Sequence, residues 1–480
     1  MQLNKIRYHL WALLGLMIIS TSCSKNYLDK NPYDSVSADD AITNIQDMQA
    51  ALSGTYASLR AVSLYGRDII LFGDMTADNL YISSNNSNRA LDFFQLNYIV
   101  TNTTVQDIWK YAYSAILNAN NVINSTLEST PEVEQLRGEA YAIRALMYFE
   151  LVKFFAKPYT VDPNGLGVPI VLEYVPTYKP ARNTTTEVYN QIEADLNKAV
   201  SLITEEKSSG FFTKYAATAL LARMYQFKGD WTNALAKAQD VINNSGYTLL
   251  SHDDVESFWG NNTDRDDKVE SLFEVVVDVS GYIFDAGGNA GKESLPYLLD
   301  QAGYGDALAS EDLYDVYSAT DVRRNLITVG SDQRGPDVKV VAKYPNSGLA
   351  DPDDMKVIRL SEIYLIAAEA AYHLNNEPDA LDYVNAIATD RDPAFAGYSS
   401  TGTALLNDIL LERRKELAFE GHRYWDLARN NRDVVRVNLD GNYLGVPLTL
   451  PTDNFRRILP IPQKEIDANP EIRGEQNAGY

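Results

Sequence analysis

The densest group of residues that could do chemistry lies near the C-terminus, in the sequence ERRKELAFEGHRYWDLAR at 412–429. Its carboxylates, guanidinium groups and histidine could transfer protons or hold a phosphate. However, Glu412, Glu416 and Glu420 recur at intervals of four, a spacing that favours ion pairs along one helix. We therefore interpret this motif as a salt-bridged helix, followed by a second helix that carries Trp425, and expect it to serve helix packing.

Other enzyme signatures are weak in this sequence. Its four histidines lack partners at metal-ligand spacing, and it contains no G-x-S-x-G elbow and no Walker loop. A carboxylate pair for glycoside hydrolysis stays open, because among 65 acidic residues some pair always lies at the required separation. The run Asn261 to Asp267 could bind calcium but lacks the EF-hand pattern, so we interpret it as a solvated acidic loop. We expect no catalytic residue, no metal and no cofactor.

Two stretches mix aromatic rings with carboxylate and amide groups. Sugars present C–H faces that stack on rings, and hydroxyl pairs that suit carboxylates or amides, so this mixture is typical of a carbohydrate site. For each ring alone, core packing is the alternative. The first stretch, 65–94, contains the candidates Tyr65, Asp78, Asn79 and Tyr81, with Arg89; the second, 259–304, contains Trp259, Tyr282, Phe284 and Tyr304, with Asp285, Tyr297 and Asp300.

The N-terminus predicts export. Lys5 and Arg7 precede an apolar run at 10–19, which at about ten residues is too short to cross a ~30 Å hydrocarbon core. The only cysteine, Cys23, follows three small residues and has no partner for an internal disulfide. We therefore predict a lipoprotein signal peptide at 1–22 and acylation of Cys23. A plain secretory signal with an incidental cysteine is the alternative.

Composition limits the partners of the chain. The formal charge is −23, so nucleic acid is excluded as a partner, because phosphate binding requires clustered Lys and Arg. With 45% hydrophobic and 22% charged residues, the chain is globular and long enough for a large core. After Cys23 no apolar stretch approaches the roughly 18 residues of a membrane helix. We expect a soluble body held on a membrane by lipid.

The elements that must position these residues are mainly α-helices. Residues 23–35 read as a lipidated cysteine and spacer, 36–250 as an N-terminal helical region, 251–350 as a loop-rich insertion, and 351–480 as a C-terminal helical region with a tail. The insertion, with a β-like segment at Phe273–Val279, is the candidate ligand-binding region. Apolar spacing predicts helices over 105–127, 131–156, 186–203, 211–228 and 231–243.

Two segments match the spacing of a tetratricopeptide repeat. Residues 221–241 place small and apolar residues on two helices around a Gly229-Asp230 turn, and residues 367–387 repeat the offsets around a turn at 375–378. The small alanines let two antiparallel helices approach closely. Two copies nearly 150 residues apart are too few for a simple solenoid, so we predict a helical scaffold that carries an elaborated insertion.

Several phrases, taken together and in order, resemble the SusD/RagB family, the surface glycan-binding lipoproteins of Bacteroidetes-type bacteria. They cover nearly the whole chain after the signal. The phrases are CSKNYLDKNP (23–32), WKYAYSAILNANNVI (109–123), RGEAYAIRALMYFELVKFF (137–155), RLSEIYLIAAEA (359–370), ERRKELAFEGHRYWDLAR (412–429) and LPIPQKEIDANP (459–470).

This resemblance implies a tetratricopeptide-based helical fold and a lipid anchor in the outer membrane, facing the cell exterior. It also implies capture of an oligosaccharide and its delivery to a SusC-like TonB-dependent transporter, without covalent chemistry. Members bind through loops that differ from one another, so the resemblance transfers a region and no particular side chain. A tetratricopeptide-type protein-binding scaffold and a surface glycoside hydrolase are the alternatives.

Overall fold

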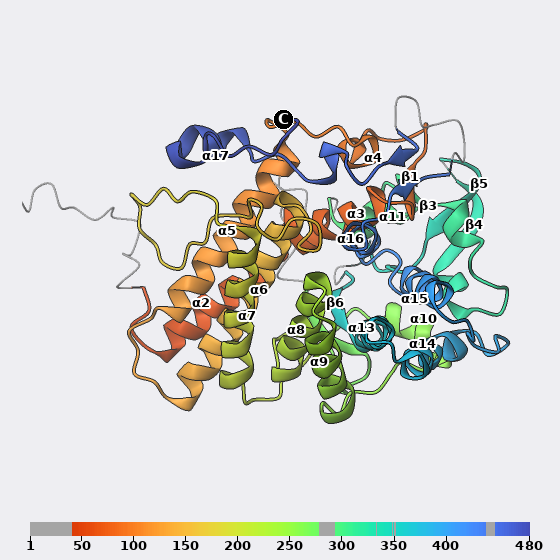
Figure 1. Cartoon of the computed structure of the whole chain (residues 1–480), viewed down its shortest axis with the longest axis horizontal. Helices are drawn as coiled ribbons and strands as arrows, with labels where there is room; N and C mark the ends of the chain where they lie inside the picture. Colours follow the sequence, from red (N-terminus) through yellow and green to blue (C-terminus); the bar gives the residue numbers. More distant parts are fainter. Residues whose placement is uncertain (1–40, 278–292, 333, 348, 350–351, 438–446) are drawn as a thin grey trace, which may run out of the picture.

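Helices packed side by side form the framework of the chain (Figure 1). The computed structural model describes residues 41–277, 293–332, 334–347, 349, 352–437 and 447–480. Its longer helices are α2 (Ile45–Ser58), α5 (Thr103–Ile123), α6 (Pro131–Phe155), α7 (Thr185–Leu202), α8 (Lys214–Lys228), α9 (Trp231–Asn244), α13 (Leu360–His373), α14 (Glu377–Arg391) and α15 (Thr403–Glu416). Each packs on the next from α2 through α9, and α13 continues the row beyond α9. None of the described helices is long and apolar enough to span a membrane.

Local capping explains where these helices begin. Thr130 accepts a hydrogen bond from the Val133 amide at the start of α6, and Pro131 occupies the first turn, as the sequence predicts. The predicted helix over 211–228 begins later, at Lys214, because the Thr213 side chain caps it by accepting from the Ala216 amide. Periodicity in the sequence therefore located these two helices, and a threonine cap set the first residue of each.

The two repeat-like segments are both antiparallel helix pairs. α8 ends at Gly229, whose φ of +73° lets the chain reverse into α9. α13 and α14 are joined through Asn375, which also has a positive φ. Because α9 packs against α13, the two pairs are neighbours in space although the insertion separates them in sequence (Figure 1).

Short antiparallel strand pairs join parts of the chain that are far apart in sequence. β2 (Ser271–Val275) pairs with β6 (Met355–Arg359), which closes the insertion at its base. The strand that the sequence predicts over Phe273–Val279 begins earlier in the structure, at Ser271. The last two residues of the predicted segment, 278 and 279, lie outside the described part. The remaining pairs are β1 (Leu80–Ile82) with β3 (Ala307–Ala309), β4 (Ile327–Asp332) with β5 (Gly335–Val341), and β7 (Val434–Val435) with β8 (Thr449–Leu450).

Short helices lie between the long helices, in the insertion and in the C-terminal tail. They are α3 (Asp68–Met75), α4 (Leu91–Gln95), α10 (Val255–Trp259), α11 (Leu295–Leu299), α12 (Glu311–Tyr314), α16 (Arg423–Arg429) and α17 (Gln463–Ala468). Single helical turns lie at Val62–Gly66, His252–Asp254, Val322–Leu326, Phe455–Arg457 and Pro470–Ile472.

One aromatic cluster ties the C-terminal part of the chain to the N-terminal helices. The Trp425 ring of α16 stacks on Phe72 of α3 at 5.4 Å and meets Phe154 of α6 at 5.1 Å. α3 can approach this region because Gly73 lies against Gly421; a Cβ on Gly73 would stand 2.0 Å from the Gly421 carbonyl oxygen. One large hydrophobic core therefore includes residues from both ends of the described chain, and a second, smaller cluster lies among α13, α14 and α15.

Candidate functional site

The β1–β3 pair brings together the two stretches that the sequence selected for sugar binding. Leu80 lies opposite Ala309 and Ile82 opposite Ala307, so the segment after β1 runs beside the segment before β3. Across this junction the Ser87 amide donates to Asp306 Oδ1 at 3.0 Å. The paired strands β1 and β3 are more than 200 residues apart in sequence, yet they lie side by side (Figure 1).

An aromatic and charged surface forms at this junction. The Arg89 guanidinium lies over the Tyr304 ring, 3.5 Å from its centroid, and Tyr297 meets Tyr304 at 5.0 Å with the rings at 80°. Arg89 Nε lies 3.3 Å from Glu293 Oε1, and the same carboxylate pairs with Arg67 at 2.8 Å. The side chains of Arg67, Arg89, Glu293, Tyr297 and Tyr304 are all partly exposed. We call Arg89, Glu293, Tyr297 and Tyr304 the Tyr304 surface.

The charges beside the Tyr304 surface are held in place by one another. Burial lowers the pKa of the Arg67 guanidinium, but Asp68 and Glu293 outweigh burial and raise that pKa. Glu293 therefore faces two guanidinium groups, and its ion pair with Arg89 helps to hold that guanidinium over the Tyr304 ring. The arrangement offers ring surface, hydrogen-bond donors and a carboxylate acceptor within a few ångströms.

Five of the predicted ligand residues have a different role from the one expected. Tyr65, Asp78, Asn79, Tyr81 and Trp259 are buried. The Tyr65 hydroxyl donates to Glu150 at 3.0 Å, and Trp259 lies beneath Lys343, 4.1 Å from the ring centroid. Because all five side chains are buried, we leave them out of the proposed ligand surface.

Asp78 illustrates how the neighbouring polar residues support the scaffold. Its carboxylate accepts from Arg423 at 2.7 Å and lies 3.4 Å from Arg414. Burial raises the pKa of Asp78, but the two arginines outweigh burial and hold that pKa below its ordinary value. Asn79 donates to Asp74 at 2.6 Å and accepts from Arg414 at 2.9 Å. These contacts fasten the residues just before β1 to the charged motif in α15 and α16.

The other predicted residues divide into two groups. Tyr297 and Tyr304 lie in the junction with Arg89, and Asp300 accepts a hydrogen bond from Ser347 at 2.5 Å. Tyr282, Phe284 and Asp285 lie outside the described residues, as do Cys23 and the signal segment. Glu293 was not among the predicted residues, because no aromatic residue stands next to it in sequence. It is part of this surface because of its two arginine partners, Arg67 and Arg89.

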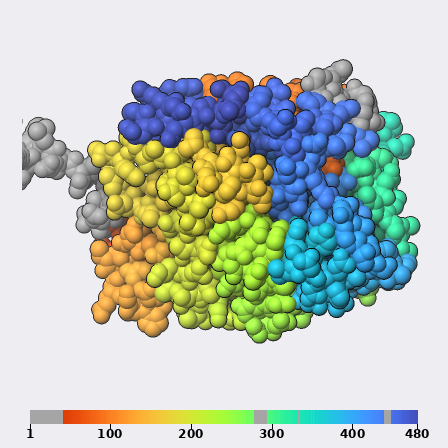
Figure 2. Space-filling model, viewed as in Figure 1, coloured from red at the N-terminus to blue at the C-terminus, as the bar shows by residue number. Residues whose placement is uncertain are grey.

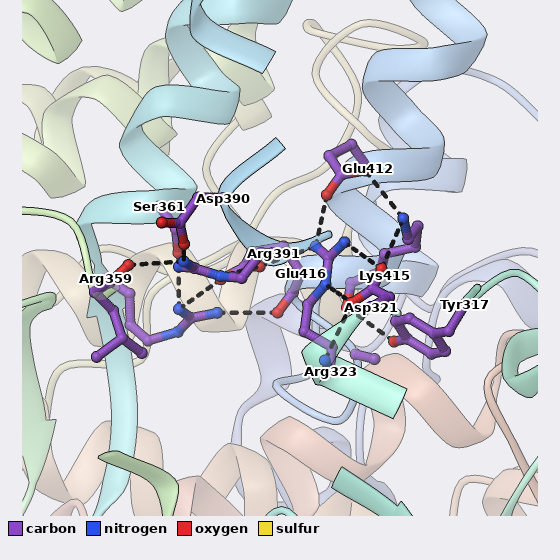
Figure 3. Close-up of polar contacts among 12 residues, drawn as sticks. Tyr317, Asp321, Arg323, Arg359, Ser361, Asp390, Arg391, Glu412, Lys415 and Glu416 are labelled. Atoms are coloured by element: carbon purple, nitrogen blue, oxygen red, sulfur yellow. Dashed lines mark hydrogen bonds and ion pairs between the residues drawn. The ribbon is translucent and has the colours of Figure 1, made fainter. Parts of the chain in front are cut away.

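The charged motif at 412–429 is an internal ion-pair network (Figure 3). Glu416 lies 3.0 Å from Arg323, 3.1 Å from Arg359 and 3.2 Å from Arg391. Burial raises the pKa of Glu416, but the arginines outweigh burial and hold that pKa well below its ordinary value. Glu412 pairs with Arg323 at 2.5 Å. The structure therefore confirms a packing role for the motif, but these ion pairs join α15 to other elements instead of running along one helix, and Glu420 lies beyond the end of α15.

The acidic run at 261–267 uses its oxygens within the protein. Asp267 pairs with Arg265 and accepts from the Val269 amide at 3.0 Å, and the Asn261 side chain accepts from the Thr263 amide at 3.0 Å. Within the described part of the chain, no cluster of three His, Cys, Asp or Glu residues is arranged to hold a metal ion.

The fold and this surface define a class: helical-repeat proteins with a loop-rich lobe that presents an aromatic and polar surface. Family models assign the chain more narrowly. A model described as "Starch-binding associating with outer membrane" matches residues 26–226, and one described as "SusD family" matches residues 335–480. The chain belongs to the SusD/RagB family.

Individual relatives agree with this assignment over nearly the full length. A putative sugar binding protein from Bacteroides vulgatus is 31% identical, with 92% of this chain and 99% of that chain covered and a TM-score of 0.81. The SusD-like protein P2 of Formosa agariphila is 29% identical over 97% of this chain and 98% of its own. Surface glycan-binding protein A from Bacteroides thetaiotaomicron, solved with laminarihexaose, shares the fold at 20% identity, with 90% and 99% of the two chains covered and a TM-score of 0.69.

Proposed function

We propose that this protein captures an oligosaccharide at the Tyr304 surface and leaves it chemically unchanged. The observation that carries this proposal is the Arg89–Tyr304 stack, which places an aromatic pair beside a guanidinium and a carboxylate. Sugar hydroxyl pairs suit these charged groups, and sugar C–H faces suit the rings. The sugar-binding and glycan-binding descriptions of two relatives support the same choice.

The experiment that tests capture is affinity electrophoresis through gels that contain one polysaccharide each. We would include starch, which the matching family description names, and a laminarihexaose-type β-glucan, which a relative binds. Capture predicts that one polysaccharide retards the native protein and that free oligosaccharide reverses the effect. Unchanged migration in every gel of a broad panel would contradict it.

The proposed partner is a SusC-like TonB-dependent transporter, to which the captured sugar passes. This partner is implied by membership of the family, and the long helical row offers a broad surface for such a contact. We expect extraction in mild detergent to recover this chain together with a large β-barrel protein, because stable interfaces of this kind commonly bury more than about 2,000 Å². Recovery of this chain alone in several detergents would count against the partnership.

The proposed anchor is lipid on Cys23, in the outer membrane and facing the cell exterior. We expect Cys23→Ala to leave a folded protein that no longer fractionates with outer membranes, because acyl chains contribute about 0.8 kcal/mol per buried CH₂. Membrane fractionation with immunoblotting measures this directly, with Ser22→Ala as the control. If Cys23→Ala fractionates with membranes as the unmodified protein does, the proposed lipid anchor is refuted.

A further inference from the structure

A second concave site lies away from the Tyr304 surface and shares no residue with it. A cavity of about 440 Å³ opens where the end of α6, α16 and the C-terminal segment at 452–458 meet. The segments that line it, coloured yellow and blue, adjoin on one face of the molecule (Figure 2). Its volume falls in the range of about 300–1,000 Å³ that is typical of small-molecule sites.

The walls of this cavity are mostly apolar and aromatic. Tyr189, Phe227, Trp425 and Phe455 contribute rings, with aliphatic side chains between them. Phe455 is exposed, whereas Tyr189, Phe227 and Trp425 are buried and leave only small parts of their surface accessible. A flat or apolar molecular body would therefore replace water against these walls, which favours binding.

The charged groups that line the cavity are unbalanced. Lys153, Lys157, Arg429 and Arg457 lie in its wall, and Asp453 is the single acid among the lining residues. This excess of cations is notable in a chain whose net charge is −23. The lining itself therefore carries more basic than acidic side chains.

Two of these cations already have carboxylate partners behind the wall. Arg429 pairs with Glu369 at 2.5 Å, and Lys153 pairs with Glu150 at 2.8 Å. Their charges are largely neutralised and add little to the field inside the cavity.

Arg457 differs, because its guanidinium has no acid partner within the described residues. It is only 9% exposed, and Nη1 donates to the backbone carbonyls of Arg432 at 3.0 Å and Leu450 at 3.3 Å. A guanidinium carries five N–H donors, so two backbone bonds leave it both charged and able to donate further. Lys157 stands at the rim, 3.8 Å from Asp162, and is exposed. A buried charge without a counter-ion costs free energy, and an anionic ligand would offset that cost.

We propose that this cavity binds a small amphipathic anion, in which a carboxylate, sulfate or sulfonate is attached to an aromatic or aliphatic body. The aromatic walls contact the body, and Arg457 and Lys157 meet the charge. This site is separate from the glycan surface and does not depend on the proposed function.

The test uses two dyes that share an aromatic body and differ in charge. 1-Anilinonaphthalene-8-sulfonate is anionic, and N-phenyl-1-naphthylamine is its neutral counterpart. Fluorescence titration of the folded protein should show one saturable site for the sulfonate and at least about tenfold weaker binding of the neutral dye. Equal binding of the two dyes, or no saturable binding of the sulfonate, would overturn the proposal.

Two exposed residues of the lining locate the site without disturbing the fold. Lys157→Gln should weaken sulfonate binding by about threefold or more, and Asp453→Asn should strengthen it by a similar factor, because each changes one charge at the mouth. Neither should change binding of the neutral dye. Arg457→Gln should weaken binding further, but it also removes two hydrogen bonds to backbone carbonyls. The decisive variants are therefore those of Lys157 and Asp453. Lys179→Gln, an exposed lysine elsewhere, is the control; if it acts like Lys157→Gln, the dye reports total charge and the site is refuted.

Discussion

Replacing Glu416 by alanine is expected to lower the free energy of unfolding by about 3–5 kcal/mol. The side chain is buried and lies within 3.2 Å of three arginines, Arg323, Arg359 and Arg391. Removing one member of a buried ion-pair network leaves the other charges without compensation, which costs far more than losing a surface pair. Urea denaturation followed by circular dichroism measures the change.

The control for this prediction is a carboxylate on the surface. Glu205 lies 3.9 Å from Lys207 and is exposed, so Glu205→Ala should change stability by less than about 1 kcal/mol. If Glu416→Ala lowers the free energy of unfolding by as little as this control does, the network does not hold the fold together.

Acidity should act on the same network. Because the folded-state pKa of Glu416 is well below the ordinary value of 4.5, its stabilising contribution is complete above that value and is lost as the pH falls toward the folded-state pKa. Glu416→Gln removes the titrating group. It should therefore be less stable than the unmodified protein at neutral pH, and the difference should narrow as the solution is acidified below about pH 4.5.

Replacing Tyr304 by alanine is expected to weaken glycan binding by about 2 kcal/mol, or about thirtyfold, with little change in melting temperature. The ring is only partly buried, and it supports the Arg89 guanidinium as well as offering its own surface. Losing the ring therefore removes the aromatic surface offered to a sugar and the ring on which Arg89 stacks. Isothermal titration with the retarding glycan, beside thermal melts, measures both quantities.

A matched control is Tyr174→Ala, because Tyr174 is 58% exposed and lies on a loop outside the junction. Its affinity should equal that of the unmodified protein. If instead Tyr304→Ala binds normally and Tyr174→Ala does not, the ligand surface has been placed on the wrong part of the molecule.

Much of the helical framework could be predicted from the sequence, because the signals are local. The Gly229-Asp230 turn and the Thr130-Pro131 start act within a few residues of themselves, and the structure confirms both. The neighbouring positions of α9 and α13 could not be predicted in this way. They depend on β2 pairing with β6 across more than 80 residues, and backbone pairing at that distance leaves no periodic pattern.

The candidate site was predictable only as a region. The two chosen stretches do meet at β1 and β3, but side chains could not be sorted into exposed and buried from composition. Trp259 is covered by Lys343, and Tyr65 is bound to Glu150; these partners are 84 and 85 residues away. Conversely, Tyr304 is part of the proposed site because Arg89, from the other stretch, lies over it.

The central claim is that the chain binds a glycan and releases it unaltered. The most direct measurement is calorimetric titration with the glycan selected by gel retardation. The sugar is then recovered from the calorimeter cell and its chain length is measured by chromatography. We expect saturable binding at one site on the native protein, abolished or strongly weakened in Tyr304→Ala, and recovered sugar of unchanged chain length. Shortened chains would identify a hydrolase, and an absence of heat with every glycan would contradict capture.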